Sequence, residues 1–141
     1  MEFQELVEKS QALEVTYHVN PDVYFGFQRI SSDFNPLHTD EAFARSKGFS
    51  ERVMYGNILN AFVSHFVGMA LPTRDVMIQT QDIQFRKPVY LGDELLLKSS
   101  QEVISEAVEI INYKLKFYRM GGAKTELVAT GHVQIGMLHN K

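Results

Sequence analysis

The chain opens with two short segments whose apolar residues follow different periods. Residues 1–10 carry apolar side chains at helical spacing, which predicts an amphipathic helix. Residues 13–19 alternate instead, and their odd-numbered apolar side chains share one face. This alternation predicts a strand, with His18 on the opposite face and exposed to solvent.

Two further helices are predicted before position 50. Asn20 is a favoured N-cap, and Pro21 suits the first helical position, so a helix should begin there and end at residues 31–32. A shorter helix should follow, capped by Thr39 or Asp40. The segment between these two helices is therefore expected to be a loop.

Residues 52–70 form the longest apolar segment of the chain. Their apolar side chains cover most of a helical circumference, which is typical of a buried helix. Pro72 should end it. Asn57, Asn60 and Ser64 fall on one stripe of this helix. They could hydrogen-bond to neighbouring strands or a partner subunit, or they could line a path for a ligand.

The remainder of the chain is predicted to be strands. Short turns separate them, which favours an antiparallel meander. A buried helix followed by such strands packs best when the sheet wraps around the helix, an α+β arrangement of the hot-dog type. We predict a single domain over residues 1–141. The expected strands are Val76–Val89, with one slip of phase, Glu94–Val103, Val108–Tyr118 and Glu126–Met137.

Composition excludes several classes of function. There are no cysteines among the 141 residues, and the five histidines lack the spacings of common metal sites, so no metal is expected. The formal charge is −3 and no dense basic run exists, which argues against nucleic acid as a partner. No apolar run is long enough to span a bilayer, and the N-terminus lacks a signal core. We expect a cytoplasmic protein with no membrane partner.

The stretch 33–38, Asp-Phe-Asn-Pro-Leu-His, carries the candidate chemistry. Asn-Pro favours a turn, which would fold the chain so that Asp33 and His38 face one point. A carboxylate and an imidazole that converge on one water form an acid/base pair. An ordinary surface loop would have the same composition. Gly56, near the start of the long helix, would let a ligand approach free backbone N–H groups and the positive end of the helix dipole.

Three segments together resemble the MaoC-like family of (R)-specific enoyl-CoA hydratases and 3-hydroxyacyl thioester dehydratases. The first runs from Phe27 through the 33–38 stretch to Ala44. The second is residues 53–56, Val-Met-Tyr-Gly, and the third is residues 82–93, which include Arg-Lys-Pro-Val at 86–89. The resemblance spans residues 27 to 93, and it implies the hot-dog fold.

The resemblance also implies a reaction and a set of roles. Asp33 and His38 would hold one water and add it in the syn sense to a trans-2-enoyl thioester, or catalyse the reverse dehydration. The backbone N–H of Gly56 would stabilise negative charge on the thioester oxygen. No cofactor is needed for this chemistry. We expect the substrate to contact Asn35, Tyr55, Asn57, Asn60 and Arg86.

The chain departs from the family pattern at three positions. Ser32 stands where the family usually has glycine, and Tyr55 where a histidine often precedes the glycine. Ala61 aligns with a helix serine that often neighbours the catalytic pair. The acid/base pair itself is retained, so these departures bear on substrate choice and rate.

The thioester carrier would be coenzyme A or acyl carrier protein. Lys47, Arg52, Arg86 and Lys87 are candidates for phosphate contacts, although each could be a solvated surface charge. Strand alternation would place only one of Arg86 and Lys87 on a given face. An open sheet edge favours pairing with a second copy, so we expect a homodimer with its sites near the subunit interface.

Two other functions fit the same fold. A hot-dog thioesterase would use a carboxylate on the long helix, but residues 53–70 contain no Asp or Glu. A non-catalytic subunit that binds acyl thioesters is the second alternative, favoured by the substitutions at Ser32 and Ala61.

Overall fold

The computed structural model describes residues 1–141 and contains one sheet of five antiparallel strands. The strands lie in the order β1-β3-β4-β5-β2. Their bounds are β1 (Ala12–His18), β2 (Val76–Phe85), β3 (Glu94–Ser105), β4 (Ile110–Arg119) and β5 (Glu126–Met137). Each expected strand is present, and β2 ends at Phe85 instead of continuing to residue 89.

The predicted meander is correct for β3, β4 and β5 but wrong for β2, which pairs with β5 at one edge of the sheet. The connection over residues 86–93 crosses the sheet instead of turning back. Its far end is bound to the end of β1, because the N–H of Val19 donates to the carbonyl of Asp93 at 2.9 Å. Gly92 N–H in turn donates to the Val19 carbonyl at 2.7 Å. Therefore β3 begins beside β1, at the edge opposite β2.

Most of the helices in the first 46 residues agree with the sequence pattern. They are α1 (Phe3–Lys9), α2 (Pro21–Ser31), α3 (Pro36–Thr39) and α4 (Glu41–Ser46). The side chain of Asn20 accepts a hydrogen bond from Val23 N–H at 2.9 Å, and Asp40 accepts one from Phe43 N–H at 3.2 Å. Both predicted caps are thus confirmed, whereas α3 lies inside the segment expected to be a loop.

The central helix is shorter than predicted. It consists of α5 (Ile58–His65) followed by a π-helical turn, η1 (Phe66–Ala70). Residues 52–57 are not helical, because this segment pairs with the connection after β2. Val53 forms an isolated bridge with Tyr90, and Met54 N–H donates to the carbonyl of Val89 at 2.8 Å. Apolar composition alone does not distinguish such a buried extended segment from a helix.

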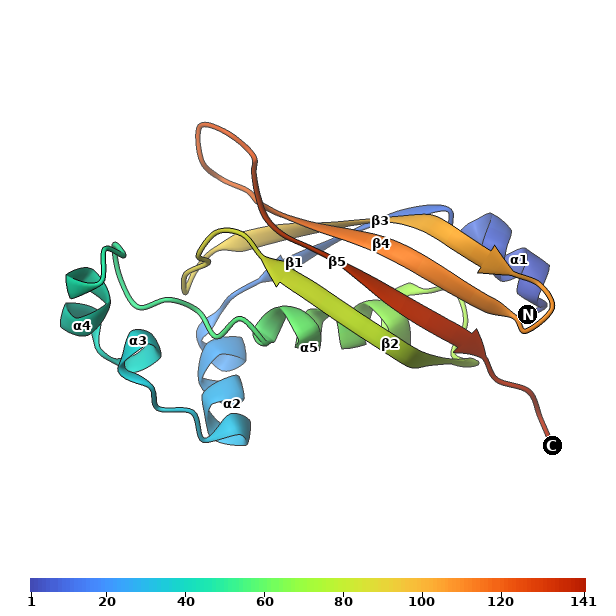
Figure 1. The fold of residues 1–141 in the computed structure, drawn as a ribbon, viewed down its shortest axis with the longest axis horizontal. Coiled ribbons are helices and arrows are strands. Elements are labelled where there is room, and N and C mark those ends of the chain that lie inside the picture. The colour runs from blue at the N-terminus through green and yellow to red at the C-terminus, as the bar shows by residue number, and fades with distance from the viewer.

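α5 lies along one face of the sheet, with α1 at one end of the molecule and α2, α3 and α4 at the other (Figure 1). Its side chains join the inward-facing residues of the strands in one core cluster of 25 buried residues. On β4 the alternation is strict, since Ile111, Tyr113, Leu115 and Phe117 are fully buried. None of the helices has the length and hydropathy needed to cross a bilayer.

Candidate active site

The loop that carries Asp33 and His38 is shaped by its own side chains. α2 ends at Ser31, and Ser32 adopts the left-handed conformation with φ 54° and ψ 28°, which turns the chain. The Asp33 carboxylate then accepts a hydrogen bond from Asn35 N–H at 3.0 Å. Asn35 accepts one from Leu37 N–H at 2.9 Å, which caps α3. This sequence of turns brings Asp33 and His38 to the same side of the loop.

The two side chains lie opposite each other without touching. Nε2 of His38 is 4.0 Å from Oδ2 of Asp33, which is too long for a direct hydrogen bond. A water oxygen about 2.8 Å from each of these two atoms would form hydrogen bonds to them at about 90° to each other. This angle is close to the angle between the two O–H bonds of water. The side chains are 15% and 44% exposed, so solvent reaches the gap. The geometry therefore suits one shared water.

The orientation of the imidazole is set by its other nitrogen. Nδ1 of His38 lies 2.6 Å from the backbone carbonyl oxygen of Val53. Because a carbonyl oxygen only accepts, Nδ1 carries a proton in this contact. In the neutral ring Nε2 therefore presents a lone pair toward Asp33, so it can accept a proton from the shared water.

Tyr55 lies behind the pair and contacts both members. Its hydroxyl donates to the backbone carbonyl of Asp33 at 2.5 Å. Its ring stacks on the His38 imidazole, with centroids 4.1 Å apart and planes 28° apart. The resemblance suggested Tyr55 as a contact for substrate, but its hydroxyl proton is already committed to Asp33.

Gly56 borders the pair just before α5. Its backbone N–H donates to no group of the protein, whereas its carbonyl accepts from Leu59 N–H at 3.0 Å. A free N–H at a helix start is available to an oxygen that gains negative charge. The ring of Phe85 covers the other side of Gly56, where a Cβ would come within 3.1 Å of two ring carbons.

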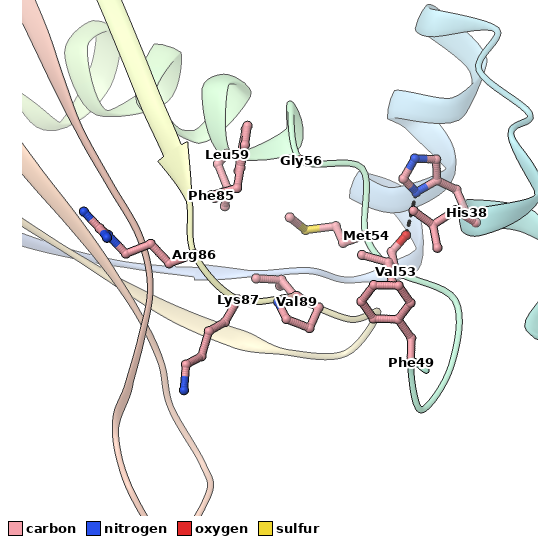
Figure 2. A pocket seen from close by; sticks show the side chains of 12 residues that line it. His38, Phe49, Val53, Met54, Gly56, Leu59, Phe85, Arg86, Lys87 and Val89 are labelled. Carbon is pink, nitrogen blue, oxygen red and sulfur yellow. Dashed lines mark hydrogen bonds between the residues drawn. The ribbon is translucent and has the colours of Figure 1, made fainter. Parts of the chain in front are cut away.

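Two pockets meet at His38, Gly56 and Phe85. The first, of about 340 Å³, is mostly apolar and lies between residues 49–59 and the end of β2 (Figure 2). Its walls are Leu37, His38, Phe49, Val53, Met54, Gly56, Leu59, Phe85, Arg86, Lys87, Pro88 and Val89. The second, of about 310 Å³, is lined by Phe27, Asp33, His38, Tyr55, Gly56, Asn57 and Phe85. The first pocket therefore reaches His38, and the second reaches both Asp33 and His38.

Phe49, Met54 and Phe85 were not identified as site residues from the sequence. Met54 and Phe85 lie within the segments that resemble the family, which is the one signal that could have marked them. Phe85 is 55% exposed although it is a large apolar residue. Its position at the junction of the two pockets accounts for this exposure.

The asparagines of the helix stripe hydrogen-bond mainly to the protein. Asn60 donates to the side chain of Asn57 at 2.8 Å, and Gln81 of β2 donates to the side-chain oxygen of Asn60. Contact with a neighbouring strand, the first of the two interpretations, is therefore present. Asn57 also lines the second pocket, whereas Asn60 and Ser64 line neither.

Arg86 and Lys87 both lie at the side of the first pocket away from His38 (Figure 2). Their side chains leave the backbone in different directions, since the Arg86 guanidinium hydrogen-bonds to Thr130 and Gln84 whereas Lys87 reaches Glu126. Their backbone N–H groups both donate to the carbonyl of Val128, at 2.9 and 3.1 Å, just beyond the end of β2. Lys87 pairs with Glu126 at 2.7 Å, and this hydrogen bond lowers the pKa of the Glu126 carboxyl.

The three remaining candidate cations form no ion pair like that of Lys87. Arg86 makes no ion pair and donates to the hydroxyl of Thr130 at 3.2 Å. Arg52 lies over the ring of Tyr24 and Lys47 over the ring of Phe43, and neither lines the two pockets. No three His, Asp or Glu side chains gather closely enough to hold a metal ion.

Comparison with known proteins connects this site to a family. The model of the family described as "MaoC like domain" matches residues 2–116. The (R)-specific enoyl-CoA hydratase of Aeromonas caviae is 30% identical over 132 residues, which cover 89% of this chain and 96% of that protein. A mitochondrial 3-hydroxyacyl-[acyl-carrier-protein] dehydratase of Arabidopsis thaliana is 34% identical over 70 residues, covering 50% of this chain and 41% of that protein.

A solved structure gives the same result. The (R)-hydratase of A. caviae involved in PHA biosynthesis superposes with a TM-score of 0.79 at 27% identity, covering 90% of this chain and 94% of that one. The five-stranded sheet over a central helix is thus the hot-dog fold, as the sequence pattern predicted. With a family model that matches most of its length and a relative aligned almost end to end, the chain belongs to the MaoC-like domain family.

Proposed function

We propose that this protein catalyses the reversible syn addition of water to trans-2-enoyl thioesters, which yields (3R)-hydroxyacyl thioesters. The observation that carries the proposal is the 4.0 Å gap between Nε2 of His38 and Oδ2 of Asp33, which fits one water. The A. caviae relative is an (R)-specific enoyl-CoA hydratase, and the A. thaliana relative is a 3-hydroxyacyl-acyl-carrier-protein dehydratase. Both names describe this reaction in one direction or the other.

The proton inventory of the reaction suits the pair. The water oxygen bonds to C3 as the water loses one proton, and C2 gains one proton, so the pair ends with the number it began with. Asp33 and His38 divide the roles of base and acid. Since Nδ1 of His38 is bound to the Val53 carbonyl, Nε2 is the ring atom that takes up or releases the mobile proton. Both transfers occur on one side of the double bond, which makes the addition syn.

The thioester oxygen gains negative charge as water adds. The Gly56 N–H has no acceptor in the protein and precedes α5, so a thioester oxygen placed there would meet both a donor and the positive end of the helix dipole. Donors that are fixed before the reaction stabilise such charge by about 3 kcal/mol each. We assign this role to Gly56.

A thioesterase remains the alternative within the same fold, and the side chains of α5 argue against it. A carboxylate on the central helix would have to act as base or nucleophile, but Ile58–His65 contains no acidic residue. A subunit that only binds acyl thioesters would have no need for an imidazole and a carboxylate spaced for one water. The preformed pair therefore favours catalysis.

Purified protein mixed with crotonyl-CoA tests the proposal. We expect the enoyl-thioester absorbance to fall and (3R)-hydroxybutyryl-CoA to appear, identified by chiral analysis. Release of free thiol from crotonyl-CoA or butyryl-CoA would support the thioesterase instead. Saturable binding of crotonyl-CoA with no change of absorbance and no thiol would support the non-catalytic subunit.

We also propose that two copies associate along β2. This strand occupies one edge of the sheet and pairs only with β5, so its other side presents unpaired backbone groups over residues 76–85. Natural proteins rarely leave such an edge uncovered. Phe85 and Gly56 lie at the end of this strand, so pairing along it would bring the two candidate sites near the interface.

A further inference from the structure

Tyr55 is the one side chain that links both members of the candidate pair. It is 2% exposed, so it contacts mainly the protein and borders the second pocket with only a small part of its surface. Its hydroxyl bonds to the backbone of Asp33, and its ring stacks on His38 at 4.1 Å. The sequence separation between Tyr55 and Asp33 is 22 residues, so this contact joins the loop to the segment that leads into α5.

The contacts around His38 leave its ring one orientation. Nδ1 is bound to the carbonyl of Val53, and one face of the imidazole is covered by Tyr55. The backbone of His38 is also held, because the hydroxyl of Tyr24 donates to its carbonyl at 2.7 Å. Without the Tyr55 ring, the imidazole would lose the surface that keeps it aligned with Asp33.

The other half of the pair depends on the hydroxyl. Asp33 follows Ser32, whose left-handed conformation is uncommon for a residue with a side chain. The bond from Tyr55 to the Asp33 carbonyl fixes the backbone directly after this turn. Tyr55 itself is packed between the rings of Phe27 and Tyr24, at 5.2 and 5.3 Å.

We propose that Tyr55 is a positioning residue that holds Asp33 and His38 at the separation that one water molecule bridges. Its hydroxyl proton is committed to Asp33, so it acts through the pair and does not donate to the substrate. Burial raises the pKa of Tyr55, which keeps this hydroxyl a donor across the working pH range. The inference rests on the proposed hydratase function, because it assigns a role to Tyr55 within that reaction.

Two substitutions separate the contacts of Tyr55. Tyr55→Phe removes the bond to Asp33 and retains the ring, and Tyr55→Leu removes both. A misplacement of about 1 Å costs about 100-fold in rate, so we expect kcat for crotonyl-CoA to fall about 10-fold in the first variant and about 100-fold in the second. KM should stay within about twofold, because the lost interactions do not touch substrate.

Tyr113→Phe is the matched control. Tyr113 is fully buried, and its hydroxyl shares a hydrogen bond of 2.6 Å with Ser10 at the α1 end of the molecule. Like Tyr55→Phe, this variant should have a lower melting temperature than the wild type, but it should keep the wild-type kcat per folded molecule. A raised KM with unchanged kcat in Tyr55→Phe would assign Tyr55 to substrate binding. Unchanged kcat and KM with lower stability would leave Tyr55 a purely structural role. Either result overturns the inference.

A second measurement needs no substrate and separates this inference from the proposed function. The ¹⁵N shifts of the His38 ring should report the Nδ1–H tautomer in the wild type and in Tyr113→Phe. They should report mixed tautomers in Tyr55→Leu, because an imidazole that no longer stacks on residue 55 can turn away from the Val53 carbonyl. A single unchanged tautomer in Tyr55→Leu would refute the alignment of His38 by Tyr55. If Asp33→Asn keeps full turnover, the hydratase mechanism fails. If Asp33→Asn loses turnover while Tyr55→Phe and Tyr55→Leu do not, only the positioning role fails.

Discussion

The ring of Phe85 lies against Gly56 so closely that a Cβ at position 56 would come within 3.1 Å of two of its carbons. Gly56 therefore serves two purposes at once: it presents a free N–H, and it allows β2 to end over the start of α5. A substitution at this position affects packing and chemistry together, so a single variant does not separate them.

Gly56→Val should reduce turnover of crotonyl-CoA about 100-fold or more through loss of access to the N–H. It should also destabilise the protein by about 1–3 kcal/mol, because the side chain overpacks against Phe85. The double variant Gly56→Val with Phe85→Leu relieves the clash and should regain melting temperature but not kcat. Recovery of both would mean that Gly56 acts through packing alone.

The acid/base pair is tested directly by Asp33→Asn and His38→Ala. Each should lower kcat by at least about 100-fold, the usual contribution of a positioned acid or base. His18→Ala is the control, because His18 is exposed on β1 and should keep full turnover. Near-native turnover in either pair variant, with circular dichroism showing an intact fold, would end the assignment.

Ser32 occupies a position that suits glycine. Its φ of 54° costs a residue with a side chain about 1–2 kcal/mol, partly offset by the greater chain entropy of glycine. Ser32→Gly should therefore stabilise the protein by about 0.5–1 kcal/mol, measured by thermal or urea unfolding. Ser31→Gly should do the opposite, because Ser31 ends α2 and its hydroxyl accepts from Asp33 N–H at 3.2 Å. Equal effects of both would contradict the backbone explanation.

Arg86 is the candidate cation that borders the apolar pocket without an ion pair, and its guanidinium hydrogen-bonds to Thr130 and Gln84 at the rim. Arg86→Gln should raise KM for crotonyl-CoA about threefold to fivefold, as expected for an exposed charge contact. KM for crotonyl-pantetheine, which lacks the nucleotide phosphates, should not change. Lys87→Gln should have a smaller effect because Lys87 is paired with Glu126. Equal increases for both thioesters in Arg86→Gln would place Arg86 elsewhere in the site.

The open edge of β2 predicts association in solution. Light scattering at micromolar concentration should give twice the 16.1 kDa of one chain. Amide hydrogen exchange should find the β2 amides that point away from β5 protected. A mass of one chain, with fast exchange at those amides, would show that the edge stays uncovered.

The sequence by itself determined what depends on near neighbours in the chain. Side-chain alternation and N-caps identified the strands, α2 and α4, and the slip of phase in β2 matches the register shift between Ile78 and Thr80. The Asp-Phe-Asn-Pro-Leu-His stretch marked Asp33 and His38, because turn chemistry within a few residues brings them together. The family resemblance rested on these local motifs too, and the family assignment is confirmed.

Only the tertiary structure decided the relations between distant segments. The crossing of residues 86–93 places β2 beside β5, and the pairing of Met54 with Val89 keeps residues 52–55 out of the helix. Local periodicity contains no information about such partners. For the same reason the sequence pattern did not reveal the contacts of Tyr55 with Asp33 and His38, because Tyr55 lies in a separate segment of the chain. The role that we propose for it follows from where the fold places its ring and its hydroxyl, which spacing along the sequence does not indicate.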